Sequence, residues 1–342
     1  MSLLTPQRPV DLRDELPGSS DGSGLPAFAI ELEGLTKVYA GSRRMLPKRA
    51  LEGVDLKIPR GSFFALLGPN GAGKSTLINI LAGLVVKTSG TAHVFGVDID
   101  AHPRRARRVI GVVPQELNLD AFFTPREALE MQAGLYGIPP AERRTDEILA
   151  AVGLSDKADA YARSLSGGMR RRLLVAKALV HRPPVVILDE PTAGVDVELR
   201  RSLWAYMQEL NREGVTVVLT THYLEEAEQL CDWIAIIDKG HVVACDRKEQ
   251  LLRQLDSKEL TITLAQAPAV LPPALAAMGA ELDGLGRVVV RYRPSRVQVG
   301  QILEQVRASG CEIADLATRE ADLEALFLRL TGKRPESEDP EA

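Results

Sequence analysis

A glycine-rich stretch with one lysine and two hydroxyl side chains has the residue types that bind a triphosphate. Residues 68–76 read GPNGAGKST, in which Gly68, Gly73, Lys74 and Ser75 fill the fixed positions of the phosphate-loop pattern G-x-x-x-x-G-K-[ST]. Glycines let the backbone turn tightly and aim its N–H groups at phosphate oxygens, Lys74 adds a point charge, and the Ser75 hydroxyl suits Mg²⁺. The candidate phosphate contacts are Gly68, Pro69, Asn70, Gly71, Ala72, Gly73, Lys74, Ser75 and Thr76.

Two acidic residues at the end of an apolar run supply the chemistry that such a loop lacks. Residues 185–188 are apolar and lead into Asp189 and Glu190. Parallel sheets bind ligands at the carboxyl ends of their strands, where these acids would lie. Asp189 is placed to hold Mg²⁺, and Glu190 to orient and deprotonate a water that faces the γ-phosphate. The alternative is a pair of solvated acids in the turn before Pro191.

Three further side chains each have a functional and an ordinary interpretation. Gln115 follows a strand-like run and could touch Mg²⁺ or the attacking water, or be a surface glutamine. His222 follows the apolar run 215–219 and could donate to the γ-phosphate, or be structural. Tyr39 could stack on an adenine ring, or be a half-buried tyrosine of a strand.

A second anion site is predicted at the start of another helix. Ser166 stands where a helix N-cap is expected, and Gly167 and Gly168 follow it without bulky side chains. The exposed N–H groups and the helix dipole could bind an anion there. The alternative is a well-capped amphipathic helix whose residues 173, 176 and 179 face the core.

The elements around these residues predict an α/β fold. Residues 63–67 form the apolar run of a buried parallel strand, and apolar residues recur at helical spacing over 77–84. Strand-like patterns over 28–32, 35–39 and 51–58 precede this unit. From about 122 to 151 the pattern turns helical, which predicts a helical subdomain inserted into the sheet domain.

Composition limits the classes of function. The 342 residues are 45% hydrophobic with a net charge of -4, which gives no electrostatic case for nucleic acid. The cysteines, Cys231, Cys245 and Cys311, lack C-x-x-C spacing, which favours a reducing cytosol over a disulfide framework or a zinc site. No stretch has the length and apolar character of a membrane span or a signal peptide, so we expect any membrane role to depend on a partner.

With these pieces in order, the chain resembles the ATP-binding subunits of ABC transporters over about residues 28–255. The tetrapeptide LSGG at 165–168, placed between the two nucleotide motifs, carries that resemblance. It implies an α/β P-loop NTPase: an ABC ATP-binding domain with an antiparallel β subdomain, a mostly parallel core sheet and a helical subdomain at about 116–180.

The resemblance also implies a role for each matching residue. Tyr39 corresponds to the adenine-stacking aromatic, Gln115 to the Q-loop glutamine, Asp196 to the D-loop acid and His222 to the switch histidine. ATP would be bound by the phosphate loop, Tyr39, Asp196 and the signature residues. Mg²⁺ would be bound by Ser75, Gln115 and Asp189. Catalysis would depend on Lys74, Gln115, Glu190 and His222.

The sequence around these motifs is similar to that of the drug-resistance, or ABC-2, exporter branch, of the daunorubicin-resistance type. The matching stretches are GVVPQELN at 111–118, LSGGMRRRL at 165–173 and TTHYLEEAE at 220–228. Met169 replaces a common glutamine and Val195 a common D-loop leucine, but neither change removes a proposed phosphate or metal ligand. The cargo expected of this branch is a drug, an antibiotic, a lipid or a glycan.

The resemblance implies partners as well. Two copies, or two paired ATP-binding subunits, would dimerise head to tail around ATP, and a separate multi-span permease would contact the helical subdomain near 116–140. The chain would then lie in the cytoplasm, peripheral to the inner face of the membrane. The alternatives are a soluble ABC ATPase that acts on a partner such as the ribosome, and a regulatory module that binds ATP without turnover.

The sequence predicts two folded domains between two disordered tails. Residues 1–27 and the acidic 333–342 are expected to be disordered tails, and 28–255 to be the ATP-binding domain. Residues 256–332 are expected to form a small α+β domain of β-α-β-β-α-β order, closed by a helix at 322–332 that resembles the last helix of the accessory domain in the same branch.

Overall fold

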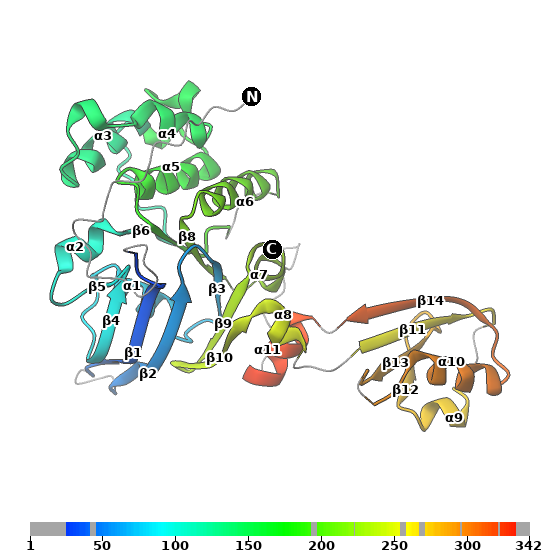
Figure 1. The fold of residues 1–342 in the computed structure, drawn as a ribbon. Helices are drawn as coiled ribbons and strands as arrows, with labels where there is room; N and C mark the ends of the chain where they lie inside the picture. Colours follow the sequence, from blue (N-terminus) through cyan, green and yellow to red (C-terminus); the bar gives the residue numbers. More distant parts are fainter. Residues whose placement is uncertain are drawn as a thin grey trace. The chain divides into compact units, whose positions relative to one another are not determined.

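The computed structural model describes residues 25–41, 46–192, 197–221, 223–253, 258–266, 271–294, 296–320 and 322–332. Asp196, Val195 and His222 lie outside these ranges, as do most of the two predicted tails. The chain divides between Asp246 and Arg247 into two compact units (Figure 1). That division precedes the short helix α8 (Lys248–Arg253), whereas the sequence placed the domain limit after it, near 255.

The first unit contains an antiparallel sheet of order β2-β1-β4-β5. Its strands are β1 (Phe28–Tyr39), β2 (Lys48–Pro59), β4 (Ser89–Val94) and β5 (Val97–Asp98). The predicted strands at 28–32 and 35–39 are one strand, and the register against β2 shifts between Leu32 and Leu35. This irregularity explains the break in the sequence pattern, because a bulge changes which side chains face the core.

The core sheet has the order β10-β9-β3-β8-β7-β6. Its strands are β3 (Phe63–Leu67), β6 (Ile110–Val113), β7 (Val185–Asp189), β8 (Thr216–Thr221), β9 (Trp233–Asp238) and β10 (His241–Arg247). Strands β9, β3, β8, β7 and β6 pair in parallel. Every residue of β3, β7 and β8 is buried, as expected of strands covered on both faces.

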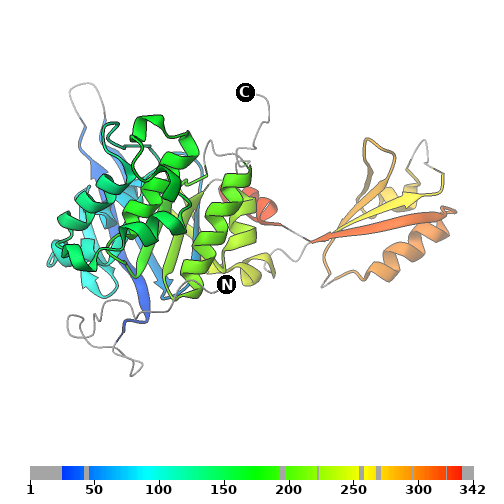
Figure 2. The ribbon, with the colours of Figure 1, turned by 90° about the horizontal axis from the view of Figure 1, so that it is seen from above.

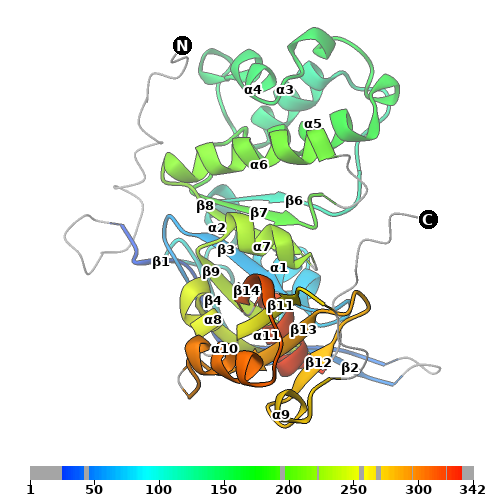
Figure 3. The same cartoon turned by 90° about the vertical axis from the view of Figure 1, so that its right-hand side faces the viewer.

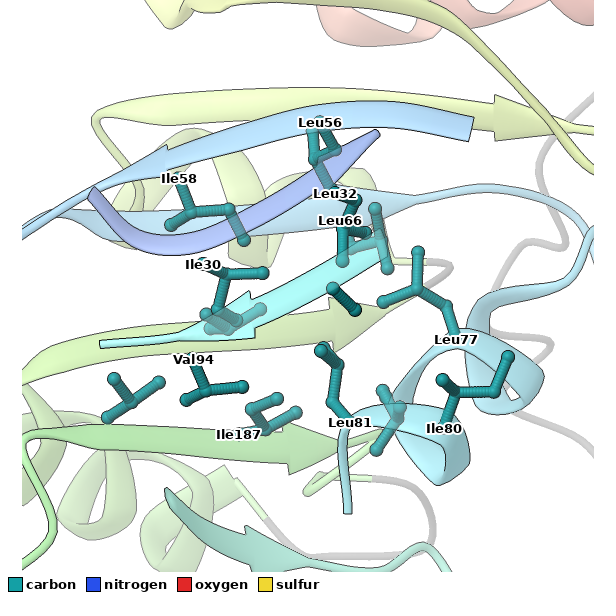
Figure 4. Packing of buried hydrophobic residues seen from close by; sticks show 14 of the residues in the cluster. Ile30, Leu32, Leu56, Ile58, Leu66, Leu77, Ile80, Leu81, Val94 and Ile187 are labelled. Carbon is teal, nitrogen blue, oxygen red and sulfur yellow. The ribbon is translucent and has the colours of Figure 1, made fainter. Parts of the chain in front are cut away.

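Helix α1 (Lys74–Leu81) fills the space between the two sheets. Leu77, Ile80 and Leu81 of α1 belong to one buried apolar cluster with Ile187 of the core sheet and Ile30 of the antiparallel sheet (Figure 4). This continuous apolar core fixes the loop that leads into α1. The remaining helices on this part of the unit are α2 (Pro103–Arg108), α6 (Val197–Arg212) and α7 (Leu224–Leu230).

A helical subdomain lies between β6 and β7 in the chain. Helices α3 (Pro125–Leu135), α4 (Thr145–Ala151) and α5 (Gly167–Leu179) group together beside β6, β7 and β8 (Figures 1 and 3). The 3-10 helices η2 (Pro140–Glu142), η3 (Ser155–Lys157) and η4 (Ala162–Ser164) join them. Thr124 and Glu127 form a reciprocal capping box that starts α3, and Leu129, Leu149 and Leu173 are fully buried between the three helices.

The second unit has the predicted β-α-β-β-α-β order. Its elements are β11 (Lys258–Leu264), α9 (Pro273–Ala276), β12 (Ala280–Leu282), β13 (Val288–Tyr292), α10 (Val299–Ala308), β14 (Ile313–Glu320) and α11 (Leu323–Thr331). The sheet order is β12-β13-β11-β14, and α9 and α10 lie on one face of it (Figures 1 and 2). Within the described ranges, no helix combines the length and the apolar character needed to cross a membrane.

Candidate functional site

The phosphate loop can be formed only with glycine at two of its positions. Gly73 has φ 116°, and a Cβ built there would lie 2.6 Å from the carbonyl oxygen of Ala50. At Gly68 a Cβ would lie 2.3 Å from the carbonyl oxygen of Ile237. Both contacts are with backbone, which cannot move aside as a flexible side chain could. The loop therefore packs directly on neighbouring backbone, and its end coincides with the N-terminus of α1, where an anion is favoured.

Lys74 places its cation inside this loop. The side chain is 5% exposed, and Nζ donates to the carbonyl oxygens of Gly68 at 2.6 Å and Pro69 at 3.3 Å. Nζ also lies 4.0 Å from Glu190 Oε1. A buried ammonium that bonds to carbonyls of a glycine loop has the charge and the donors that a phosphate oxygen requires.

Asp189 lies next to the phosphate loop because β8 pairs in parallel with both β3, which leads into the loop, and β7, which ends at Asp189. Asp189 stands opposite Thr220, and the Thr220 hydroxyl donates to Asp189 Oδ1 at 2.6 Å. Burial raises the pKa of Asp189 and the charge of Glu190 raises it further, whereas hydrogen bonds from Thr220 and Ser75 and the charge of Lys74 oppose the rise. The Asp189 carboxylate and the Ser75 hydroxyl thus lie together, and both offer the oxygen ligands that Mg²⁺ prefers.

Glu190 is held in an unusual backbone conformation that directs its carboxylate into the site. Its φ is 45°, a left-handed value that is costly for a residue other than glycine. Its N–H donates to both the carbonyl and the hydroxyl oxygen of Thr220, each at 3.1 Å. Gln115 Nε2 donates to Glu190 Oε2 at 2.8 Å. The structure therefore brings Gln115, Glu190, Asp189 and Lys74 together, and their roles in metal binding and catalysis stay predictions.

Sequence reasoning did not select Thr220, although it orients both acids. Its position in the sequence marks it as a candidate site residue, because Thr220 is polar and directly follows the apolar run 215–219. Only the structure shows the parallel register that places it opposite Asp189.

The residues predicted to form a second anion site lie at the start of α5, an element separate from the phosphate loop. Ser166 Oγ accepts a hydrogen bond from the Met169 N–H at 3.3 Å, which confirms the predicted N-cap. Ser166 and Gly167 are exposed, and a Cβ at Gly167 would meet no atom within 4 Å. Leu173 and Ala176 face the core as expected, but Leu174 and Val175 are buried too, so α5 is covered on more than one face.

Tyr39 lies at the end of β1 and its side chain is 39% exposed. Lys37 Nζ lies 4.8 Å from the centre of its ring. This exposed ring stays a predicted adenine contact. The roles of Asp196 and His222 also stay predictions, since both lie outside the described residues.

Comparison with known proteins identifies the family. The family model for the ABC transporter matches residues 51–193. The Nod factor export ATP-binding protein I of Ralstonia nicotianae is 36% identical over 323 residues, which cover 94% of this chain and 98% of that protein. The chain belongs to the ABC transporter family. The resemblance predicted from the motifs is confirmed.

Two other members of the ABC transporter family are similar over most of this chain. The daunorubicin/doxorubicin resistance ATP-binding protein of Streptomyces peucetius is 38% identical and covers 90% of this chain and 93% of its own length. The linearmycin resistance ATP-binding protein of Bacillus subtilis is 34% identical over 89% of this chain and 98% of its own length.

Solved structures of the family confirm the fold class. An ATP-binding subunit of an ABC transporter has a TM-score of 0.60 at 30% identity, over 66% of this chain and 93% of that one. A dimeric bacterial ABC transporter cassette has a TM-score of 0.58 at 29% identity, over 64% of this chain and 98% of that one. A related dimer bound to ADP and phosphate has a TM-score of 0.57 at 29% identity, over 64% of this chain and 98% of that one.

Proposed function

We propose that this chain is the ATP-binding and hydrolysing subunit of an exporter. The observation that supports this most strongly is the meeting of Lys74, Asp189, Glu190 and Gln115 at one end of the core sheet. Relatives that match nearly the full length are named for export or for antibiotic resistance. The cargo is then expected to be a drug, an antibiotic, a lipid or a glycan.

In this proposal the polar groups of the site have defined tasks during hydrolysis. The glycine loop and Lys74 bind the β- and γ-phosphates, and Glu190 accepts a proton from the attacking water. Gln115 fixes the Glu190 carboxylate through the 2.8 Å hydrogen bond. Bound Mg²⁺, which Ser75 and Asp189 would hold together with Gln115, supplies charge neutralisation of the triphosphate.

The proposal predicts that binding and hydrolysis can be separated by two substitutions. Glu190→Gln is expected to keep ATP affinity within about threefold and to lower kcat by roughly 10²–10⁴-fold, because the base is lost and the loop is intact. Lys74→Ala is expected to weaken ATP binding itself, since the buried cation is removed. Equilibrium binding of a fluorescent ATP analogue and phosphate release measure the two effects. Unchanged turnover in Glu190→Gln would remove it from the general-base role.

We further propose that two copies close head to tail on ATP. One helix N-terminus neutralises a triphosphate only in part, and α5 begins at two exposed residues, Ser166 and Gly167, with open space beside Gly167. In the closed dimer the signature residues of one copy would face the phosphate loop of the other. A solved relative of similar fold is described as dimeric, which supports this arrangement.

We also propose a separate membrane permease as the partner of the helical subdomain. Large apolar side chains stand exposed there, led by Leu135 at 75% and Phe122 at 73%. Nearby, a cavity of about 170 Å³ opens beside the Gln115 segment; its lining includes Pro114, Gln132 and His181. Exposed apolar surface of this kind fits a protein partner. Association with that permease would place the chain at the inner face of the membrane.

The alternatives are less well supported. A soluble ABC ATPase that acts on the ribosome is not favoured, because the similar proteins described above are named for export or resistance. A module that binds ATP without turnover does not explain why Glu190 is held in a left-handed conformation against Gln115.

A further inference from the structure

Three consecutive arginines of α5 are bonded to three different parts of the backbone. Arg170 donates to the carbonyls of residues 162 and 163, and Arg172 to those of residues 152 and 153. Both therefore hold α5 within the helical subdomain. Arg171 differs, because its guanidinium leaves the subdomain and reaches the core sheet domain.

The contact that Arg171 makes is with the residue before Gln115. Arg171 Nη1 donates to the Pro114 carbonyl oxygen at 2.7 Å, and the side chain is only 4% exposed. Burial lowers the pKa of Arg171, and the negative charge of Asp189 opposes that shift. A buried guanidinium is costly unless carbonyls and a carboxylate compensate it, so this arginine is held in one arrangement.

A short chain of contacts then leads from α5 to the water-activating group. Arg171 holds the Pro114 carbonyl, Gln115 follows in the chain, and Gln115 Nε2 donates to Glu190 Oε2 at 2.8 Å. Arg171 lies five residues after the Ser166 N-cap, about 7 Å along the same rigid helix. A displacement of the Ser166 end of α5 would therefore act on the Pro114 carbonyl and, through it, on the Gln115 amide that contacts Glu190.

We propose that Arg171 is a positioning residue for ATP hydrolysis, which sets Gln115 against Glu190 according to the position of the signature helix. This inference rests on the proposed ATPase function. Arg171 would link the helical subdomain to the Glu190 carboxylate. Contact of Ser166 with a second copy would then change the position of Gln115 relative to Glu190. Arg171 itself touches neither nucleotide nor water in this account.

The test is a double-mutant cycle in the full chain with phosphate release as the readout. Arg171→Gln is expected to lower kcat about tenfold with ATP affinity within about twofold, because the loss of one charge-assisted hydrogen bond misplaces Gln115. In the Gln115→Ala background, Arg171→Gln is expected to change kcat by less than about twofold, since the group that it positions is gone. Arg171→Lys, which keeps a cation and a donor, is expected to restore most of the rate.

Arg172→Gln is the matched control, because it removes the same group from the same helix and alters bonds inside the helical subdomain only. It is expected to change thermal stability but not kcat. Equal losses of kcat from Arg171→Gln with and without Gln115 would overturn the inference, and so would an unchanged kcat in Arg171→Gln. If Arg171→Gln does not fold, Arg171→Met, which keeps an unbranched side chain but removes the donor, takes its place in the same cycle under the same criterion. A wild-type chain without turnover would instead contradict the proposed function.

Discussion

At the scale of single residues, Thr220 determines how the two acids of the site are presented. Its hydroxyl donates to Asp189 and accepts from the Glu190 N–H, so one side chain supports both the expected metal ligand and the expected base. Hydrogen bonding to an ionised carboxylate favours the charged form. Thr220 therefore counteracts the burial that raises the pKa of Asp189.

Thr220→Val should shift the acid side of the pH–rate profile to higher pH. Without the hydroxyl, the pKa of Asp189 rises further, and the carboxylate that must be ionised is lost at a less acid pH. The measurement is kcat/KM for ATP between pH 5 and 9. Thr216→Val is the control, since it makes the same change at the opposite end of β8, where the hydroxyl accepts from the Gly61 N–H. Superimposable profiles for Thr220→Val and wild type would contradict this role.

At the scale of elements, the sequence predicts where the strands lie in the chain better than it predicts which strands pair with one another. Strand β3 at 63–67 matches the predicted run, because an unbroken buried apolar pattern defines it. The contact between Gln115 and Glu190, 75 residues apart, depends on β6 pairing with β7 so that Val113 lies opposite Leu188. No local sequence pattern predicts that pairing. The role of Arg171 could not be predicted either, because three arginines in a row are typical of a solvated helix face.

Stability of the helical subdomain should depend on pH through His181. The ring stacks on Tyr136 at 3.8 Å between centroids, and Nε2 lies 3.0 Å from the Ile110 carbonyl oxygen. Burial lowers the pKa of His181 to about 4. Between pH 6.5 and about 4 the unfolded chain binds this proton and the folded chain does not, so the free energy of unfolding falls as the pH falls.

His181→Phe, which keeps the stacked ring, is expected to remove about 2 kcal/mol of the loss in unfolding free energy between pH 7 and pH 5. Urea unfolding at the two pH values measures this. His102→Phe, the same substitution at an exposed histidine, is the control. A His181→Phe chain that loses as much stability as wild type on acidification would refute this assignment.

At the scale of the whole molecule, ATP is expected to convert monomers to dimers. The Glu190→Gln chain should sediment as a dimer with ATP and Mg²⁺ and as a monomer without them, because bound ATP then persists. Ser166→Arg added to it should abolish the dimer while each monomer still binds ATP, since the signature end of α5 is blocked. Ser155→Arg, an equal charge at another exposed site of the subdomain, is the control. Dimers that persist in Ser166→Arg would contradict the head-to-tail arrangement.

The most direct test of the exporter assignment is the identity of the partner. A tagged Glu190→Gln chain would be recovered from detergent-solubilised membranes of its own cells in ATP and Mg²⁺, with Lys74→Ala as the control that does not retain ATP. If the chain is an exporter subunit, an integral membrane protein of several spans should be enriched over that control. Recovery of ribosomal or other soluble partners alone would contradict the exporter and indicate a mechanical ATPase that acts away from the membrane.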